Sequence, residues 1–220
     1  MRTYFYSVGT IITVLSFCTF YLIAATLYPG GTWADPSTLR HSFGGNYLCD
    51  VLKVTAHNGL PNIGRTYGFI AFFFLFAALL FWWALLTSLL PKQFSTLRKV
   101  VRIATFLSAA GFVGMIFAPP SPNLLSPHFF AVITAVLCGL AVTFLLLASL
   151  LKIPAYRSLG QLGFLLISPV VPNISMYIAY HLNLFTVSVS QIIFVTKIVV
   201  INAILICLLS ALKQIRMTYR

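Results

Sequence analysis

The chain has 220 residues, of which 60% are hydrophobic and only 7% are charged, whereas a soluble domain carries about 25% charged residues. Fourteen Lys and Arg against two Asp and Glu give a formal net charge of +12. So few charges cannot cover the surface of a soluble protein of this size. The composition therefore excludes a soluble enzyme, a disordered chain and a disulfide scaffold, and indicates a polytopic membrane protein.

Six continuous apolar stretches are each long enough to cross a bilayer, which requires about 20 residues. They cover roughly residues 4–28, 66–90, 100–118, 128–151, 160–182 and 188–212, and prolines follow three of them (Pro29, Pro91 and the pair Pro119-Pro120). The first stretch exceeds the apolar core of about 7–15 residues in a signal peptide, so we expect a retained span. We predict an all-α transmembrane bundle forming a single integral membrane domain over residues 1–220, with a long outer loop at 29–65.

The orientation follows from the distribution of Lys and Arg. With six spans, one side carries ten of these cations and the other carries three. The first group is Arg2, Lys92, Arg98, Lys99, Arg102, Lys152, Arg157, Lys213, Arg216 and Arg220, and the second is Arg40, Lys53 and Arg65. We therefore expect both termini in the cytoplasm. The positive charge is then a topology signal with affinity for anionic headgroups, and we expect no nucleic-acid partner.

The connection at 29–65 holds both acids of the chain, Asp35 and Asp50, together with His41 and His57. The other two histidines lie at span ends that face the same side: His128 opens the fourth span and His181 closes the fifth. Connections of this length are uncommon in compact folds unless they have a function. This side of the membrane is therefore the first candidate for a site.

Within this connection, the segment 42–57 has the pattern of an amphipathic helix. On such a helix Asp50, Lys53 and His57 share one face, at spacings of three, four and seven. One interpretation is an interfacial helix with an ordinary exposed ion pair, which stabilises little. The other is that Asp50 orients or ionises His57 beside a ligand at the membrane surface.

The sequence gives no support for a metal or another cofactor. No two histidines have the spacing HxxxH or HxH on one element, and the four cysteines form no CxxC pair. Haem held between helices needs histidines deep in the bilayer, whereas His128 and His181 lie at span ends. We therefore predict no metal site and no cofactor.

A single lysine, Lys197 in the run FVTKIVV, lies near the middle of the sixth span. An ionisable residue there is expensive and is a functional hypothesis by default. Ser190 shares its helical face, and we expect Lys197 to line a polar cavity inside the bundle. Contact with a partner subunit and extension of the side chain toward one membrane surface stay open as alternatives.

The fifth span contains Pro169 and Pro172, which free backbone carbonyls and bend a helix. Breaks of this kind occur at ligand and ion sites, although a plain packing kink explains them equally well. Asn173 follows the second proline and is a candidate partner for the freed groups. Asn173, Ser190 and Lys197 together form a candidate intramembrane polar site.

The layout resembles the DRAM-like superfamily of six-helix membrane proteins and its uncharacterised bacterial relatives. The resemblance rests on six spans, inside termini, a large first outer loop and the stretch Asn46-Tyr47-Leu48-Cys49-Asp50, followed by Asn58-Gly59 and Gly64-Arg65. It implies a role in lipid-related processes without one settled chemistry. Asp50 is the residue that it implicates, as the polar centre of the loop.

We therefore expect an outward-facing polar pocket that binds a lipid headgroup or another amphiphile for binding, sensing or remodelling. Its candidate ligand-binding residues are Asp50, His57, His41, His128, His181 and Lys53. An enzymatic version would use His57 as a general base oriented by Asp50, but the sequence does not decide whether the protein is an enzyme. Two other functions stay open: a structural or assembly subunit with partner subunits or a homo-oligomer, and a small channel or transporter using Lys197 and the broken fifth span.

Overall fold

A computed structural model describes residues 1–118, 125–182, 184 and 186–219, without the side chains of Leu125 and His181. The described residues are helical apart from turns and two isolated β-bridges, and the helices include six candidate membrane spans. The protein is therefore an all-helical, multi-pass membrane protein. Its elements are α1 (Arg2–Thr26), η1 (Leu48–Leu52), α2 (Arg65–Ser88), η2 (Lys92–Phe94), α3 (Ser95–Phe117), α4 (Leu125–Leu151), η3 (Pro154–Tyr156), α5 (Arg157–Ile167), α6 (Val170–His181) and α7 (Val189–Thr218).

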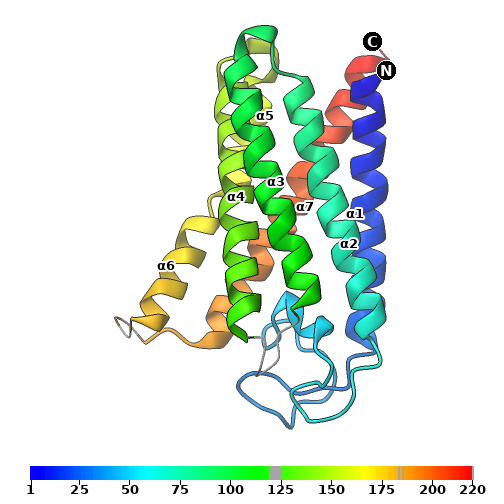
Figure 1. Cartoon of the computed structure of the whole chain (residues 1–220), viewed down its shortest axis with the longest axis vertical. Coiled ribbons are helices and arrows are strands. Elements are labelled where there is room, and N and C mark those ends of the chain that lie inside the picture. Colours follow the sequence, from blue (N-terminus) through cyan, green and yellow to red (C-terminus); the bar gives the residue numbers. More distant parts are fainter. Residues whose placement is uncertain (119–124, 183, 185, 220) are drawn as a thin grey trace.

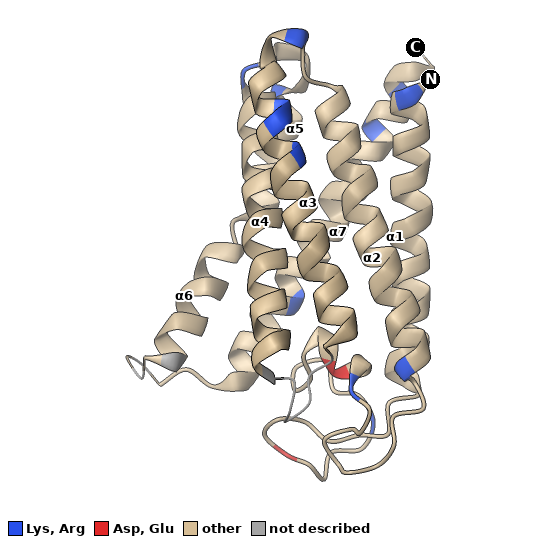
Figure 2. Cartoon of the chain, viewed as in Figure 1, with Lys and Arg blue, Asp and Glu red and all other residues tan. Residues whose placement is uncertain are grey.

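Both termini lie at one end of the bundle, and the connection between α1 and α2 lies at the other (Figure 1). We call these the terminal end and the loop end. Figure 2 shows that most Lys and Arg gather at the terminal end, whereas both acids lie at the loop end. The two ends therefore differ in charge as the sequence predicts.

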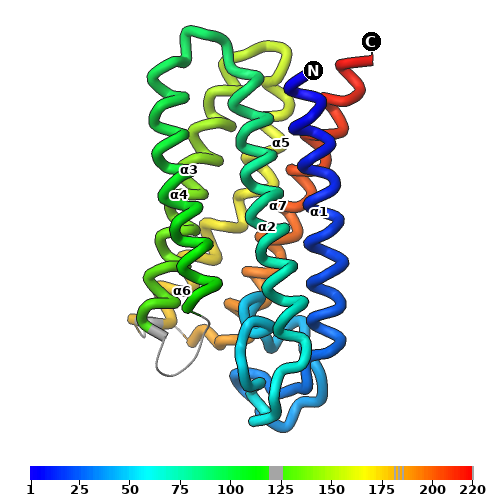
Figure 3. Tube along the Cα trace, turned by 45° about the vertical axis from the view of Figure 1, so that its right-hand side comes forward, coloured from blue at the N-terminus to red at the C-terminus, as the bar shows by residue number. Residues whose placement is uncertain are grey.

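Two helical hairpins form most of the bundle: α1 packs along α2, and α3 packs along α4 (Figure 3). Helix α7 packs against α1 and α5, and closes the bundle. Small residues set the distance between α3 and α4, because a Cβ on Gly111 would lie 2.5 Å from the backbone nitrogen of Ala135. Such close approach is the usual role of glycine between membrane helices.

Trp82 and Trp83 are buried in the core of the bundle, each 2% exposed. The indole nitrogen of Trp82 donates to Ser210 Oγ of α7 at 3.2 Å, and that of Trp83 donates to Thr143 Oγ1 of α4 at 3.1 Å. A buried indole N–H needs a partner, and these two bonds give each ring one orientation. The pair therefore joins α2 to helices on both of its sides.

The helix boundaries differ from the hydropathy-based spans mainly at the terminal end. Helix α3 begins at Ser95 rather than near residue 100, and α7 continues to Thr218 rather than ending near 212. The additional turns contain Lys and Arg, which are good helix formers but end an apolar run. Pro119 and Pro120, where we expected the third span to end, lie outside the described residues.

The fifth span is divided at Ser168 and Pro169 into α5 and α6. Helix α6 leaves the direction of α5 at this break and packs against α7 (Figure 1). The predicted interruption of this span is therefore confirmed. Phe129, Tyr177, Ile178 and Leu182 line an apolar groove of about 270 Å³ between α4 and α6 toward the loop end.

Candidate functional site at the loop end

The segment 27–64 folds into a compact cap over the ends of α1 and α2. Isolated bridges pair Gly30 with Leu39 and Thr55 with Pro61. The side-chain amide of Asn62 donates to the carbonyls of Val51 and Lys53, each at 3.0 Å. These contacts fix the segment although it contains little regular secondary structure, and η1 packs against α2.

The predicted amphipathic helix over 42–57 is wrong, because only the short helix η1 forms there. Gly44 and Gly45 disfavour a helix, and the side chains of Asn46 and Asp50 bond to nearby backbone groups instead. Val51 and Leu52 are fully buried in the core, which fixes the position of η1. Tertiary contacts, rather than helical periodicity, therefore place Asp50, Lys53 and His57.

Asp50 is fully buried and lies at the centre of the cap. Its Oδ2 atom accepts bonds from the Tyr47 backbone N–H at 2.9 Å and the Asn46 amide at 3.2 Å, and lies 3.3 Å from His57 Nε2. Its Oδ1 atom is buried and has no hydrogen-bond partner among the described residues. A buried polar atom without a partner is costly, so a water or ligand that donates a hydrogen bond to this oxygen would stabilise the cap.

His57 connects Asp50 to a cation. The ammonium of Lys53 lies 3.4 Å from Nδ1 and 3.3 Å from Nε2 of the imidazole, and it packs over the Trp33 ring at 5.1 Å. The Trp33 and His57 rings are 4.9 Å apart. Carboxylate, imidazole and ammonium groups thus lie in direct contact beneath an indole that is 46% exposed.

A second group of polar side chains surrounds Lys197, which is only 3% exposed. Its ammonium donates to the Tyr21 hydroxyl at 3.4 Å and packs over the Phe43 ring at 4.8 Å. The same hydroxyl lies 3.3 Å from His41 Nε2. Lys197 therefore points inward to the cap, and its contacts come from α1 and the segment 27–64.

Tyr28 joins the two groups. Its hydroxyl accepts a hydrogen bond from the backbone N–H of His57 at 3.2 Å, and its ring packs edge-on against the His41 ring at 5.8 Å. Tyr28 itself is 1% exposed. We call the whole set the loop-end cluster, and it consists of Tyr21, Tyr28, His41, Asn46, Asp50, Lys53, His57 and Lys197.

Burial determines the protonation of several side chains in the cap. It lowers the pKa of His41 to about 4, assisted by the nearby Lys197 and opposed by Asp50, so His41 is neutral at pH 7. Burial also raises the pKa of Cys49 to about 12 and that of Tyr28 to about 12. Cys49 is therefore a neutral thiol rather than a nucleophile.

Three of the remaining predicted site residues, His128, Asn173 and Ser190, make other contacts or are exposed. His128 Nδ1 lies 2.7 Å from the backbone carbonyl of Ala118, at the end of α3. Asn173 donates to Thr196 Oγ1 at 2.8 Å rather than to Lys197, and Ser190 is exposed. The side chain of His181 lies outside the described residues.

Of the candidate residues, the structure therefore brings together Asp50, His57 and Lys53, and it brings His41 to Lys197. Sequence reasoning missed Tyr21, Tyr28, Asn46 and Trp33. Two tyrosines near the end of the first span were the available signal, because tyrosine places a polar tip at a membrane boundary. Within the described ranges, no three His, Cys, Asp or Glu side chains are grouped so that they could hold a metal ion.

Comparison with known proteins finds no matching family model, no matching curated protein and no matching solved structure. The resemblance to the DRAM-like superfamily therefore stays a prediction. The chemistry of the loop-end cluster is therefore the basis on which a function can be inferred.

The depressed pKa of His41 predicts a pH-dependent stability. A histidine that is neutral in the fold and has a pKa of about 6.5 when unfolded stabilises the fold above that pH. We expect the free energy of unfolding to fall by up to about 3 kcal/mol as the pH decreases from about 6.5 to about 4. Unfolding in mixed detergent micelles at a series of pH values measures this free energy. The variant His41→Gln should show a weaker dependence of the free energy on pH. Equal slopes in both proteins would contradict the assignment.

Proposed function

We propose that the loop-end cluster binds the polar headgroup of a membrane lipid or a similar amphiphile. The single observation that carries this proposal is the buried carboxylate of Asp50, whose Oδ1 atom has no hydrogen-bond partner among the described residues while Lys53 and His57 lie beside it. This acceptor, with the Lys53 ammonium nearby, suits a ligand that carries a hydrogen-bond donor and an anionic group together. A phospholipid headgroup with an ammonium or hydroxyl group has this combination.

The apolar groove between α4 and α6 supports the same function, because its lining residues lie near the start of α4 and the end of α6. Tyr47 connects the two regions: its backbone N–H donates to Asp50, and burial, together with the proximity of Tyr177 and Asp50, raises the pKa of its phenol. In our proposal the headgroup reaches the cluster beside Tyr47, and an acyl chain lies in the groove. By the distribution of Lys and Arg, the loop end faces outward and both termini are cytoplasmic.

The proposal is tested by native mass spectrometry of the protein released from nanodiscs containing phosphatidylethanolamine, phosphatidylglycerol or phosphatidylcholine. Lys53→Gln removes the cation beside His57, and Arg40→Asn is the matched control. Arg40 is an exposed cation of the same segment with a φ of 64°, a conformation that Asn tolerates. We expect Lys53→Gln to weaken binding of the preferred lipid about tenfold, the effect of losing one charge-assisted hydrogen bond.

Arg40→Asn should leave that affinity within about twofold, because screened surface charges contribute little. The proposal fails if the wild-type protein retains no lipid class preferentially, or if the two variants lose lipid equally. Metals and soluble subunits that co-purify appear as mass increments in the same spectra. A retained protein partner in place of lipid would instead favour an assembly subunit.

A further inference from the structure

A second site lies at the terminal end, where α5 and α7 enclose a groove of about 470 Å³. Its polar lining consists of Ser158, Lys213 and Arg216, and its apolar lining includes Leu162, Leu209 and Leu212. The Leu209 and Leu212 side chains are 43% and 45% exposed, so they present an uncovered apolar wall below the two cations. This volume is within the range of about 300–1,000 Å³ that small-molecule sites occupy.

Within the part of the chain that the structure describes, the two cations of this groove pair with no Asp or Glu side chain. Asp35 and Asp50 are the only acids of the sequence, and both lie in the segment 27–64 at the loop end (Figure 2). Lys213 donates to Ser158 Oγ at 2.9 Å, which positions the ammonium and leaves two of its three donors for another acceptor. An anionic molecule would complement the charges of Lys213 and Arg216.

Arg216 lies one turn after Lys213 on α7, so the two cations share the face of the helix that borders the groove. A guanidinium binds a phosphate through two parallel hydrogen bonds, and an ammonium adds a point charge. Leu209 and Leu212 precede the two cations on α7, and Leu162 faces the groove from α5. A cationic rim above an apolar wall matches a molecule with an anionic head and a hydrocarbon chain.

We propose that this groove binds an anionic glycerophospholipid. The phosphate accepts hydrogen bonds from Lys213 and Arg216, and one acyl chain packs along Leu209, Leu212 and Leu162. The site is separate from the loop-end cluster, lies at the opposite end of the bundle and depends on different residues. Its presence does not depend on the proposed function of the loop-end cluster.

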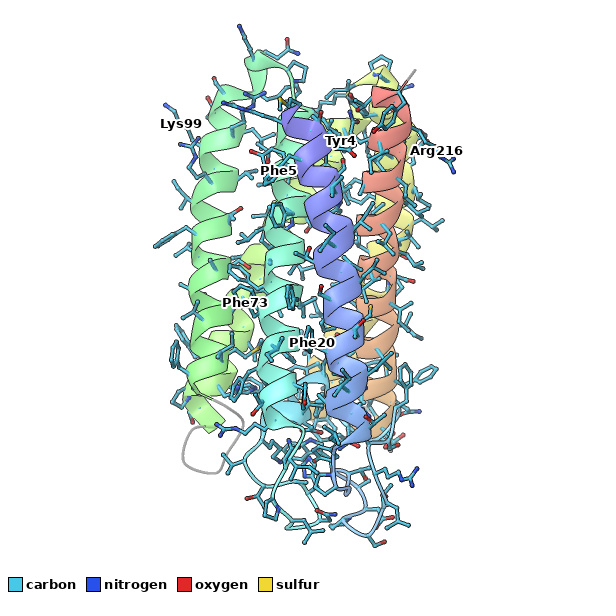
Figure 4. The ribbon with its side chains drawn as sticks, turned by 90° about the vertical axis from the view of Figure 1, so that its right-hand side faces the viewer. Tyr4, Phe5, Phe20, Phe73, Lys99 and Arg216 are labelled. Atoms are coloured by element: carbon cyan, nitrogen blue, oxygen red, sulfur yellow. The ribbon has the colours of Figure 1, made fainter. Side chains whose placement is uncertain are left out.

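The chain provides a matched control on α3. Lys99 and Arg102 have the same spacing of three, are exposed and belong to the terminal end, but they do not line the groove. Figure 4 shows Lys99 and Arg216 pointing away from the bundle on different helices at this end. The double variants Lys213→Gln/Arg216→Gln and Lys99→Gln/Arg102→Gln therefore remove equal charge from the same membrane face.

The test is titration of each protein, in neutral detergent, with phosphatidylglycerol, phosphatidylcholine or inorganic phosphate, followed by native mass spectrometry. We expect wild-type protein and the α3 variant to bind phosphatidylglycerol with similar affinity. The α7 variant should bind phosphatidylglycerol at least about tenfold more weakly, because it loses both cations that attract the anionic headgroup. Leu212→Gln, which keeps both charges, should also weaken phosphatidylglycerol binding, because it makes the apolar wall polar.

Three results would overturn the proposal. The first is an equal loss of phosphatidylglycerol in the α3 and α7 variants, which would indicate general attraction by surface charge. The second is competition by inorganic phosphate at the same concentration as the lipid, which would indicate a site for a soluble anion. The third is unchanged lipid affinity in Leu212→Gln. Asp50→Asn should not change phosphatidylglycerol binding at the groove. The two proposed sites can therefore be tested independently.

Discussion

Replacing Asp50 with asparagine is expected to destabilise the protein by about 2–3 kcal/mol and to abolish the lipid binding that we propose at the loop end. The substitution keeps the size of the side chain but changes one oxygen into an NH2 group. Either the amide takes the place of Oδ2, which accepts from the Tyr47 N–H and the Asn46 amide, or it takes the place of Oδ1. In both orientations the negative charge beside His57 and Lys53 is lost.

Asp35→Asn is the matched control for this prediction, because Asp35 is the other acid of the same segment and is exposed. Its carboxylate accepts hydrogen bonds from the Ser37 hydroxyl, the Ser37 N–H and the Thr38 hydroxyl. These bonds lower its pKa but lie at the surface, so we expect a much smaller change in stability than for Asp50→Asn.

Unfolding of both variants in mixed detergent micelles gives the free energies, and native mass spectrometry of the same samples gives the bound lipid. A stable Asp50→Asn protein that keeps its lipid would refute the role of the carboxylate. A destabilised protein that still binds lipid would restrict Asp50 to a structural role.

Gly31→Ala is expected to have a second large effect, destabilising the cap by more than about 3 kcal/mol. Gly31 has a φ of 80°, and a Cβ at this position would lie 2.4 Å from the Asn58 nitrogen and 2.6 Å from the His57 carbonyl carbon. Backbone atoms cannot move aside as a flexible side chain can. The substitution should therefore displace His57 from Asp50 and Tyr28.

Gly59→Ala separates the steric clash from the backbone conformation. Gly59 has nearly the same φ, 82°, but a Cβ there would meet no atom within 4 Å. We expect Gly59→Ala to cost only the strain of the left-handed conformation, about 1–2 kcal/mol. Hydrogen exchange of the segment 27–64 is the additional readout, because only Gly31→Ala should expose the backbone amide of His57. Similar behaviour of the two variants would show that the close approach at Gly31 contributes nothing.

The loop-end cluster shows what helical periodicity in the sequence can and cannot predict. The sequence placed Asp50, Lys53 and His57 together, but for an incorrect reason, because a helix over 42–57 does not form. The three side chains meet through Asn46, Asn62 and the buried η1. In this segment, hydrogen bonds from side chains to the backbone replace those of a helix. The spacing of hydrophobic residues does not predict such bonds.

Lys197 illustrates a different limit. Its place in an apolar run marked it as unusual, and the structure shows it to be buried. Its partners, Tyr21 and Phe43, come from more than 150 residues away in sequence, whereas Ser190 on its own helix is exposed. A helical repeat indicates which residues share a face. It does not indicate which helix or loop covers that face.

The sequence by itself determined that the chain forms six apolar helices with a strongly asymmetric distribution of cations. These properties depend on local hydrophobicity and on the length needed to cross a bilayer, and both can be counted along the chain. Only the tertiary structure decided that Tyr28 joins His57 to His41 and that α5 and α7 form a cationic groove. It also decided that one oxygen of Asp50 has no hydrogen-bond partner in the described part of the chain. Those features depend on contacts between segments distant in sequence, because burial and hydrogen-bond geometry are set by the packing of the whole bundle.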